Sequence, residues 1–282
     1  MTIYSYVTKT VEQGGWTGVS RFDASLRWVF PAMKSVTLLP ALNPDDVVIT
    51  DNHLSLDVPP EIKTIVVHHG CARTHYDRDP AWRTEHTRDM VDLQTKMLTL
   101  PNRTYVAPSD WVGLQFAALA PEQAGYCFHT IPHWVEPIPA LPKWGKPKII
   151  GDWRDNNKGA GVWKKVAARY PQWHFEQLRF ADDAGRRVQY GTASLYLCLS
   201  LSEGGPYSVC DAEAAELPIV TTDVGNCVEF QDSEIVAWEQ RDNIEIIGGL
   251  IEHKLKVGRL RPSFYREYTF EVWKQKWEQV IQ

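Results

Sequence analysis

The chain has 282 residues, of which 44% are hydrophobic and 23% are charged, a composition typical of an ordinary folded protein and not of a disordered one. Its formal net charge of −5 does not indicate an overall basic surface of the kind that binds nucleic acid or an anionic membrane. The opening residues lack the basic flank and apolar core of a signal peptide, and no later run approaches the roughly 20 apolar residues that span a bilayer. We therefore expect a cytoplasmic protein.

Short strands and helices alternate along the first half of the chain. The segment 19–30 has apolar residues at helical spacing, and a second helix is predicted after Ser109, which suits an N-cap. Segment 126–134 closes this half. Runs that are apolar or alternate with period two, bounded by Pro, Asp or Gly, predict strands over 2–8, 35–40, 45–51, 63–70 and 102–108.

A proline-rich segment, 135–147, has no apolar periodicity and reads as a linker between domains. The alternation then restarts, which implies two parallel, doubly wound α/β units. A final helix over 268–282 carries aromatic residues on one face. The elements predicted between linker and final helix are strands over 148–153, 173–180, 194–201 and 217–223 and helices over 158–170 and 208–216.

The cysteines are odd in number, which argues against a disulfide framework. The four that follow Cys71 lie in apolar or strand-like contexts, where a free cysteine behaves as a small hydrophobic residue. These four are Cys127, Cys198, Cys210 and Cys227.

The stretch Ser200–Asn226 places a carboxylate and flexible backbone between a predicted strand and an alanine-rich helix. Glu203 lies just past the strand, and the two glycines that follow it allow the backbone to approach a ligand closely. The helix, expected to begin near Ser208, directs its N-terminal amides and positive dipole end toward a ligand, which suits a phosphate. Asp211 follows Glu203 by eight positions, so we expect both carboxylates to face one ligand.

This stretch resembles the nucleotide-sugar motif of retaining GT-B glycosyltransferases of family four type, also called glycosyl transferases group 1. In that family the motif pairs two glutamates at this spacing, and here the second acid is an aspartate. The resemblance implies that Glu203 lies by the donor sugar, as a catalytic residue, and that Asp211 binds the ribose of the nucleotide. A solvated Glu followed by a helix-capping Asp is the alternative. The same motif implies nucleotide-sugar contacts for Gly204, Gly205, Pro206, Tyr207 and Ser208.

Residues 149–171 resemble the first strand and helix of the family's nucleotide domain, where an Arg and a Lys bind the diphosphate. Arg154 and Lys158 are the matching cations, although Arg154 lies one residue nearer to Lys158 than is usual; an exposed surface turn is the alternative. Near the N-terminus, Gly14 and Gly15 resemble the family's glycine loop facing the donor phosphates, a weak signal because many turns use glycine.

The predicted strand over 63–70 ends in two histidines. The resemblance implies that His69, with His68 as second choice, lies near the donor sugar as a catalytic residue; a structural histidine is the alternative. A metal site made of these two with Cys71 and His75 is not expected, because neighbouring side chains on a strand point to opposite faces. The arginine-containing segment 71–90 is expected to be a solvated loop and helix start, with an acceptor-binding surface as the alternative.

The resemblance implies a GT-B fold, with two Rossmann-like doubly wound domains facing across a cleft. The expected domains are 1–138 on the acceptor side, 139–265 for the nucleotide sugar, and a terminal helix over 266–282 that crosses back to the first. The implied activity is transfer of a sugar, a hexose by expectation, from a nucleoside diphosphate sugar to an acceptor hydroxyl, with retention. No metal and no cofactor are expected, since cationic side chains and helix amides would stabilise the leaving diphosphate.

Alternatives remain open at this point. One is a nucleotide-sugar-binding or epimerase-like protein on the same fold. The acceptor could be a glycan, a lipid-linked hydroxyl or, as in some phage relatives, a hydroxymethylated DNA base. An NAD-dependent oxidoreductase is disfavoured, because neither half has a Gly-x-Gly-x-x-Gly after its first strand. The donor base, the donor sugar and the oligomeric state are left open.

Overall fold

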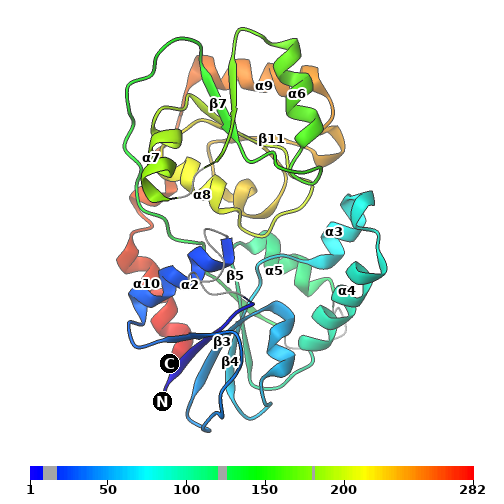
Figure 1. Ribbon diagram of the computed structural model, residues 1–282, viewed down its shortest axis with the longest axis vertical. Coiled ribbons are helices and arrows are strands. Elements are labelled where there is room, and N and C mark those ends of the chain that lie inside the picture. The colour runs from blue at the N-terminus through cyan, green and yellow to red at the C-terminus, as the bar shows by residue number, and fades with distance from the viewer. Residues whose placement is uncertain (9–17, 120–125, 180–181) are drawn as a thin grey trace. The chain divides into compact units, whose positions relative to one another are not determined.

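The computed structural model describes residues 1–8, 18–119, 126–179 and 182–282. They form two compact units: unit 1 comprises Met1–His133 and Phe270–Gln282, and unit 2 comprises Trp134–Thr269. Each unit is a parallel β-sheet with helices on both faces (Figure 1). The predicted doubly wound α/β class is therefore confirmed.

Unit 1 is built on a six-stranded sheet with the order β2-β1-β3-β4-β5-β6, all neighbours parallel. The central strands are almost continuously buried, as parallel strands covered on both faces must be. The strands are β1 (Ile3–Tyr6), β2 (Lys34–Val36), β3 (Val47–Asp51), β4 (Lys63–Val67), β5 (Arg103–Ala107) and β6 (Phe128–Thr130).

Two groups of helices cover this sheet (Figure 1). On one side lie α2 (Gly18–Val29) and α10 (Phe270–Ile281); on the other lie α3 (Ala72–Arg78), α4 (Glu85–Met97) and α5 (Asp110–Ala117). The hydroxyl of Ser109 accepts a hydrogen bond from the amide of Val112 at 3.1 Å, which confirms the predicted N-cap of α5. Short 3-10 turns, η1 (Asn52–Asp57) and η2 (Pro80–Trp82), complete the unit.

The C-terminal helix α10 packs within unit 1. Trp273 and Trp277 are both 0% exposed, and the ring of Trp277 lies 5.6 Å from that of Phe22 on α2. The ammonium of Lys276 donates to the carbonyl of Thr130 at the end of β6, at 3.3 Å. Because two of its tryptophans are buried, α10 is a core element of unit 1, although the rest of that unit lies far away in the sequence.

Unit 2 has a five-stranded parallel sheet with the order β11-β10-β9-β7-β8. From β7 the chain moves to β8 on one side, then crosses to β9 and continues outward on the other. The switch point of the sheet, where such folds bind ligands, is therefore at the carboxyl ends of β7 and β9. The strands are β7 (Lys148–Gly151), β8 (His174–Gln177), β9 (Leu195–Cys198), β10 (Ile219–Thr222) and β11 (Ser233–Val236).

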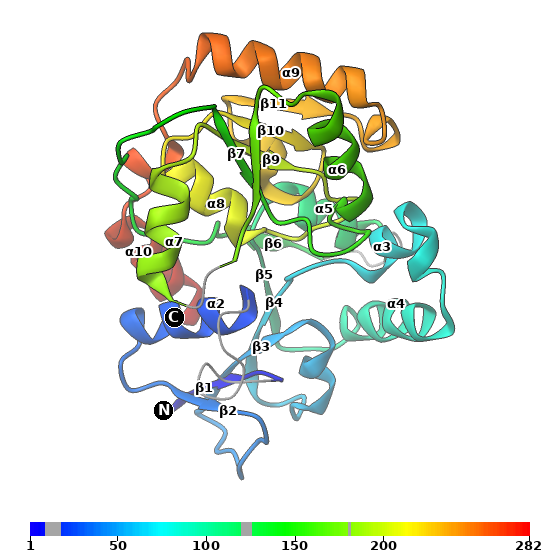
Figure 2. The ribbon, with the colours of Figure 1, turned by 45° about the horizontal axis from the view of Figure 1, so that its top comes forward.

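Figure 2 shows α6 (Ala160–Arg169) and α9 (Ile244–Val257) on one side of this sheet and α7 (Asp183–Gly191) and α8 (Tyr207–Ala214) on the other. Three further 3-10 turns are η3 (Gly225–Glu229), η4 (Trp238–Gln240) and η5 (Phe264–Arg266). The sequence did not predict α7, β11 or α9. Among the described helices of both units, none is long and apolar enough to cross a bilayer.

The segment 135–147 has no helix or strand, as predicted, but it is not a loose linker. The amide of Ile138 donates to Ala214 at 3.1 Å, and the amide of Leu141 donates to Gly191 at 2.8 Å. A Cβ on Gly191 would come within 2.8 Å of the carbonyl of Pro139. These contacts fix the segment along α7 and α8, so it is part of unit 2.

All five cysteines are free thiols. Cys198, Cys210 and Cys227 are buried, as expected from their apolar contexts, and Cys71 is buried as well. Cys127 departs from the expectation, because it lies exposed at the start of the short edge strand β6.

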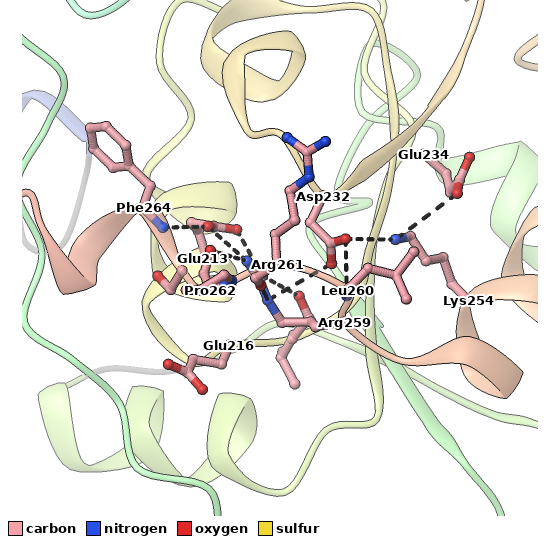
Figure 3. Close-up of polar contacts among 12 residues, drawn as sticks. Glu213, Glu216, Asp232, Glu234, Lys254, Arg259, Leu260, Arg261, Pro262 and Phe264 are labelled. Atoms are coloured by element: carbon pink, nitrogen blue, oxygen red, sulfur yellow. Dashed lines mark hydrogen bonds and ion pairs between the residues drawn. The ribbon is translucent and has the colours of Figure 1, made fainter.

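A buried ionic cluster attaches the segment after α9 to α8 (Figure 3). Glu213 accepts hydrogen bonds from Arg259 on both carboxylate oxygens, each at 2.9 Å, and from the amide of Phe264 at 2.8 Å. Asp232 contacts the ammonium of Lys254 at 3.4 Å and accepts from the amide of Leu260 at 3.1 Å. Because these ions are almost fully buried, each depends on its partners.

We expect Glu213→Ala to destabilise unit 2 by about 3–5 kcal/mol, because it leaves the guanidinium of Arg259 buried without its main counterion. Glu216→Ala is the matched control: its pair with Arg266 is exposed and should contribute no more than about 1 kcal/mol. Urea unfolding of the two variants measures the difference. Equal losses of unfolding free energy in the two variants would contradict the larger contribution expected from the buried pair of Glu213 and Arg259.

Candidate functional site

The carboxyl end of β7 is held against β9 by a buried tryptophan. The indole of Trp153 donates to the carbonyl of Leu197 at 3.1 Å, and its side chain is 1% exposed. Gly151 leaves room for this ring, since a Cβ there would lie 2.4 Å from the indole and 2.3 Å from the same carbonyl. The contact of Trp153 with Leu197 therefore fixes the place, at the switch point, where the chain leaves the sheet after β7.

The loops that follow β7 and β9 are bonded to each other. The side-chain amide of Asn157 donates to the carbonyl of Ser202 and accepts from its amide, both at 3.2 Å. The guanidinium of Arg241 donates to the carbonyls of Asn156 and Asn157 at 2.9 and 3.2 Å. The two loops are thus fixed relative to each other by backbone-directed hydrogen bonds.

These loops bring two cations and two carboxylates together. The ammonium of Lys158 forms an ion pair with Glu203 and lies 3.6 Å from Oδ2 of Asp152. The Nε of Arg154 donates to Oδ1 of Asp152 at 2.9 Å. Three residues that the sequence predicted as ligand-binding, Arg154, Lys158 and Glu203, therefore lie in one cluster. Asp152 was missed, although an acid directly after a strand that borders a switch point is a signal that could have found it.

Electrostatics keep this cluster ionised. Burial alone would lower the pKa of Lys158, but the carboxylates of Glu203 and Asp152 outweigh it and raise the pKa above its ordinary value. Burial would likewise raise the pKa of Asp152, yet the hydrogen bond from Arg154 and the charge of Lys158 lower it below its usual range. At neutral pH the site holds full charges of both signs.

The glycine turn between β9 and α8 lies directly after Glu203. The hydroxyl of Ser200 donates to Oε1 of Glu203 at 2.8 Å and orients the carboxylate. Gly225, with a φ of +54°, approaches so closely that a Cβ there would lie 2.2 Å from the carbonyl of Gly204. Gly205 and Pro206 complete the turn.

Helix α8 begins at Tyr207, close to the predicted start, and its N-cap Pro206 provides no side-chain hydrogen bond. The helix therefore directs amides without a side-chain cap toward the turn, an arrangement suited to an anion. Tyr207 is buried, and the carbonyl of Ser208 accepts from the hydroxyl of Tyr190 at 3.0 Å.

Asp211 pairs with an arginine of the neighbouring helix α7. Its carboxylate is 0% exposed and accepts a hydrogen bond from Arg186 of α7 at 2.6 Å. Asp211 is thus a counterion of a buried guanidinium that also contacts Asp183 on its own helix.

In unit 1, the two histidines after β4 point to opposite faces. His68 is fully buried and stacks on Phe116 of α5 at a ring distance of 3.7 Å. His69 meets the ring of Phe22 of α2 edge-on at 4.9 Å, at the carboxyl edge of the sheet. Burial lowers the pKa of His69, and the nearby carboxylate of Asp51 offsets part of that effect.

Two other sequence predictions concern unit 1. Gly14 and Gly15 lie outside the described residues. The arginine-containing segment 71–90, expected to be a solvated loop and helix start, includes the start of α4, but its first part forms the helix α3 and not a loop. Arg73 pairs with Asp77 one helical turn away at 2.8 Å. Within the described parts of both units, no group of three or more His, Cys, Asp or Glu side chains is placed to hold a metal ion.

The chain is similar in structure to several sugar-transferring enzymes. Sucrose-phosphate synthase from Thermosynechococcus elongatus aligns with a TM-score of 0.67 and 12% identity over 100% of this chain and 96% of that one. The α,α-trehalose-phosphate synthase (UDP-forming) from Burkholderia xenovorans aligns at 0.65 with 9% identity, over 100% of both chains. The lipopolysaccharide outer core galactosyltransferase WaaB aligns at 0.61 with 11% identity, over 100% of this chain and 99% of that one.

No family model and no curated protein matches the sequence. At these identities the structural likeness shows the fold, and that fold is GT-B, as the sequence predicted. Proteins that share this fold can differ in function, which depends on the residues of the site.

His68 gives unit 1 a specific sensitivity to acid. Burial lowers its pKa from 6.5 to about 3, so the unfolded chain binds the proton more readily than the folded one. The contribution of His68 to the free energy of unfolding is complete above pH 6.5, and it is lost as the pH falls toward the pKa of His68 in the folded state. At pH 5 we expect a loss of about 2 kcal/mol from this group.

His68→Phe should abolish that part of the acid sensitivity, because a phenyl ring can stack on Phe116 without titrating. Unfolding free energies at pH 7.5 and pH 5 measure the effect, and exposed His86→Gln is the control. An unchanged pH dependence in His68→Phe would contradict the assignment.

Proposed function

We propose that this protein is a glycosyltransferase that moves a sugar from a nucleoside diphosphate sugar to an acceptor hydroxyl, with retention at the anomeric carbon. The observation that carries the proposal is the convergence of Arg154, Lys158 and Glu203 at the switch point of unit 2. Two cations beside the start of an α-helix suit a diphosphate, and a carboxylate beside them suits sugar hydroxyls. The fold of the chain agrees with this function.

In the proposed reaction the bond between the anomeric carbon and the diphosphate oxygen breaks, and its electron pair stays on the diphosphate. The acceptor oxygen forms the new bond to that carbon on the face that the diphosphate leaves, and its proton passes to the departing diphosphate oxygen. Lys158, Arg154 and the first amides of α8 would stabilise the charge that develops on the departing diphosphate. Glu203, once Lys158 has turned to the phosphates, would accept hydrogen bonds from the donor sugar.

The remaining predicted residues keep their proposed roles. His69 would contact the donor sugar, and Gly14 and Gly15 would face its phosphates. A ribose contact by Asp211 requires Arg186 to move off its carboxylate. The trehalose-phosphate synthase of similar structure is described as UDP-forming, and the similar GtfA was solved with UDP and GlcNAc, so a nucleoside diphosphate hexose is the donor class we propose.

Ligand binding gives the direct test. UDP, GDP or ADP should raise the melting temperature of the wild-type protein, because a ligand that binds only the folded state stabilises it. Lys158→Ala should weaken that binding by about 10- to 100-fold, the value of a charge-assisted contact to phosphate. Lys165→Ala, on the exposed part of α6, is the control and should bind as the wild type does. Failure of all three nucleotides to bind would refute the proposal.

Turnover should not need a metal ion, because protein cations take the role of a divalent metal at the diphosphate. Slow hydrolysis of a bound donor sugar, followed by release of the nucleoside diphosphate, should continue in EDTA. Activity that appears only when Mn²⁺ is added would contradict this part of the proposal. Binding without any hydrolysis or transfer would instead support a nucleotide-sugar-binding protein.

A further inference from the structure

With the exposed Asp155 beside it, the cluster has three carboxylates around its two cations. The cations are Arg154 and Lys158, and the carboxylates are Asp152, Glu203 and Asp155. Asp155 is exposed and accepts from the backbone amide of Lys158 at 2.9 Å. A site that must take a diphosphate thus meets it with its cations already neutralised.

Asp152 is the carboxylate that engages both cations. Its two oxygens accept from Nε and Nη2 of Arg154, at 2.9 and 2.5 Å, and Oδ2 also lies 3.6 Å from the ammonium of Lys158. The side chain of Asp152 is only 12% exposed, so its charge is poorly screened. A paired, parallel contact with a guanidinium is the same geometry that a phosphate adopts.

The contact occupies the Nε and Nη2 edge of Arg154, which is the edge suited to a paired contact with a phosphate. A diphosphate that takes this edge replaces Asp152, and one that binds the remaining donors of this exposed guanidinium lies beside the carboxylate; in both cases Asp152 is at short range. Two negative charges a few ångström apart repel strongly enough to change a binding constant measurably, even at an effective dielectric constant of about 20. This repulsion acts on the donor and on the released nucleoside diphosphate alike.

Resting on the proposed function, we propose that Asp152 is an affinity-determining residue: it competes with the diphosphate for Arg154 and Lys158 and weakens the hold on donor and product. Weak product binding favours release, which limits turnover in many enzymes. The alternative role for Asp152 is to hold Arg154 in place for the phosphate. The two roles predict opposite changes in affinity when the carboxylate is removed.

Isothermal titration with inorganic pyrophosphate and with UDP separates them. Asp152→Asn keeps the shape and removes the charge, and it should bind both ligands about tenfold more tightly than the wild type, with slower dissociation of UDP. Asp152→Glu keeps the charge and should stay near the wild-type affinity. Asp155→Asn removes an equal charge that has no side-chain contact with either cation, and it should change affinity by less than about threefold.

Unchanged or weaker binding by Asp152→Asn, in protein with a wild-type melting temperature, would overturn the inference. Asp152→Glu provides a second reading should the Asn variant fold poorly: binding about tenfold tighter than the wild type despite its charge would also overturn it. Tighter binding by Asp155→Asn equal to that of Asp152→Asn would show a general charge effect, and would overturn it as well. Absence of binding in the wild type and in Asp152→Asn alike would contradict the proposed function, and the inference with it.

Discussion

The ion pair between Lys158 and Glu203 spans the switch point of the unit 2 sheet, and the arrangement of the surrounding chain follows from it. The two residues come from loops that leave neighbouring parallel strands in opposite directions, so only this edge of the sheet can bring them together. Gly159, with a φ of +85°, allows the chain to enter α6 directly after Lys158. A Cβ there would lie 2.6 Å from the side chain of Leu199.

Helix α8 is anchored on two sides by buried ions, which fixes where the glycine turn begins. Asp211 binds Arg186 of α7, and Glu213 binds Arg259 from the segment after α9. Buried pairs of this kind add little net stability but are costly to break, so they specify one orientation of the helix. The turn before α8 is therefore held at both ends, by the helix and by β9.

The sequence predicted the doubly buried strands best, because continuous apolar runs such as those of β4 and β9 have few other interpretations. It missed α7, whose buried positions include the charged Arg186 and so give no apolar stripe. It missed α9 because two glycines interrupt its centre. The structure gives the reason for one of them: a Cβ on Gly248 would come within 2.1 Å of the ring of Tyr170.

The cluster of Arg154, Lys158 and Glu203 could be predicted because short motifs fix these residues to strand ends. The orientation of Asp211 could not, because it depends on Arg186, 25 positions earlier in the sequence. Asp152 was missed for a similar reason. A single acid after a strand gains significance only when folding brings two cations to it.

A crystal structure of the protein with UDP bound would show which residues hold the diphosphate. We predict that the ammonium of Lys158 leaves Glu203 and lies about 3 Å from a diphosphate oxygen at the switch point of unit 2. A diphosphate bound elsewhere, with the pair between Lys158 and Glu203 intact, would contradict this prediction.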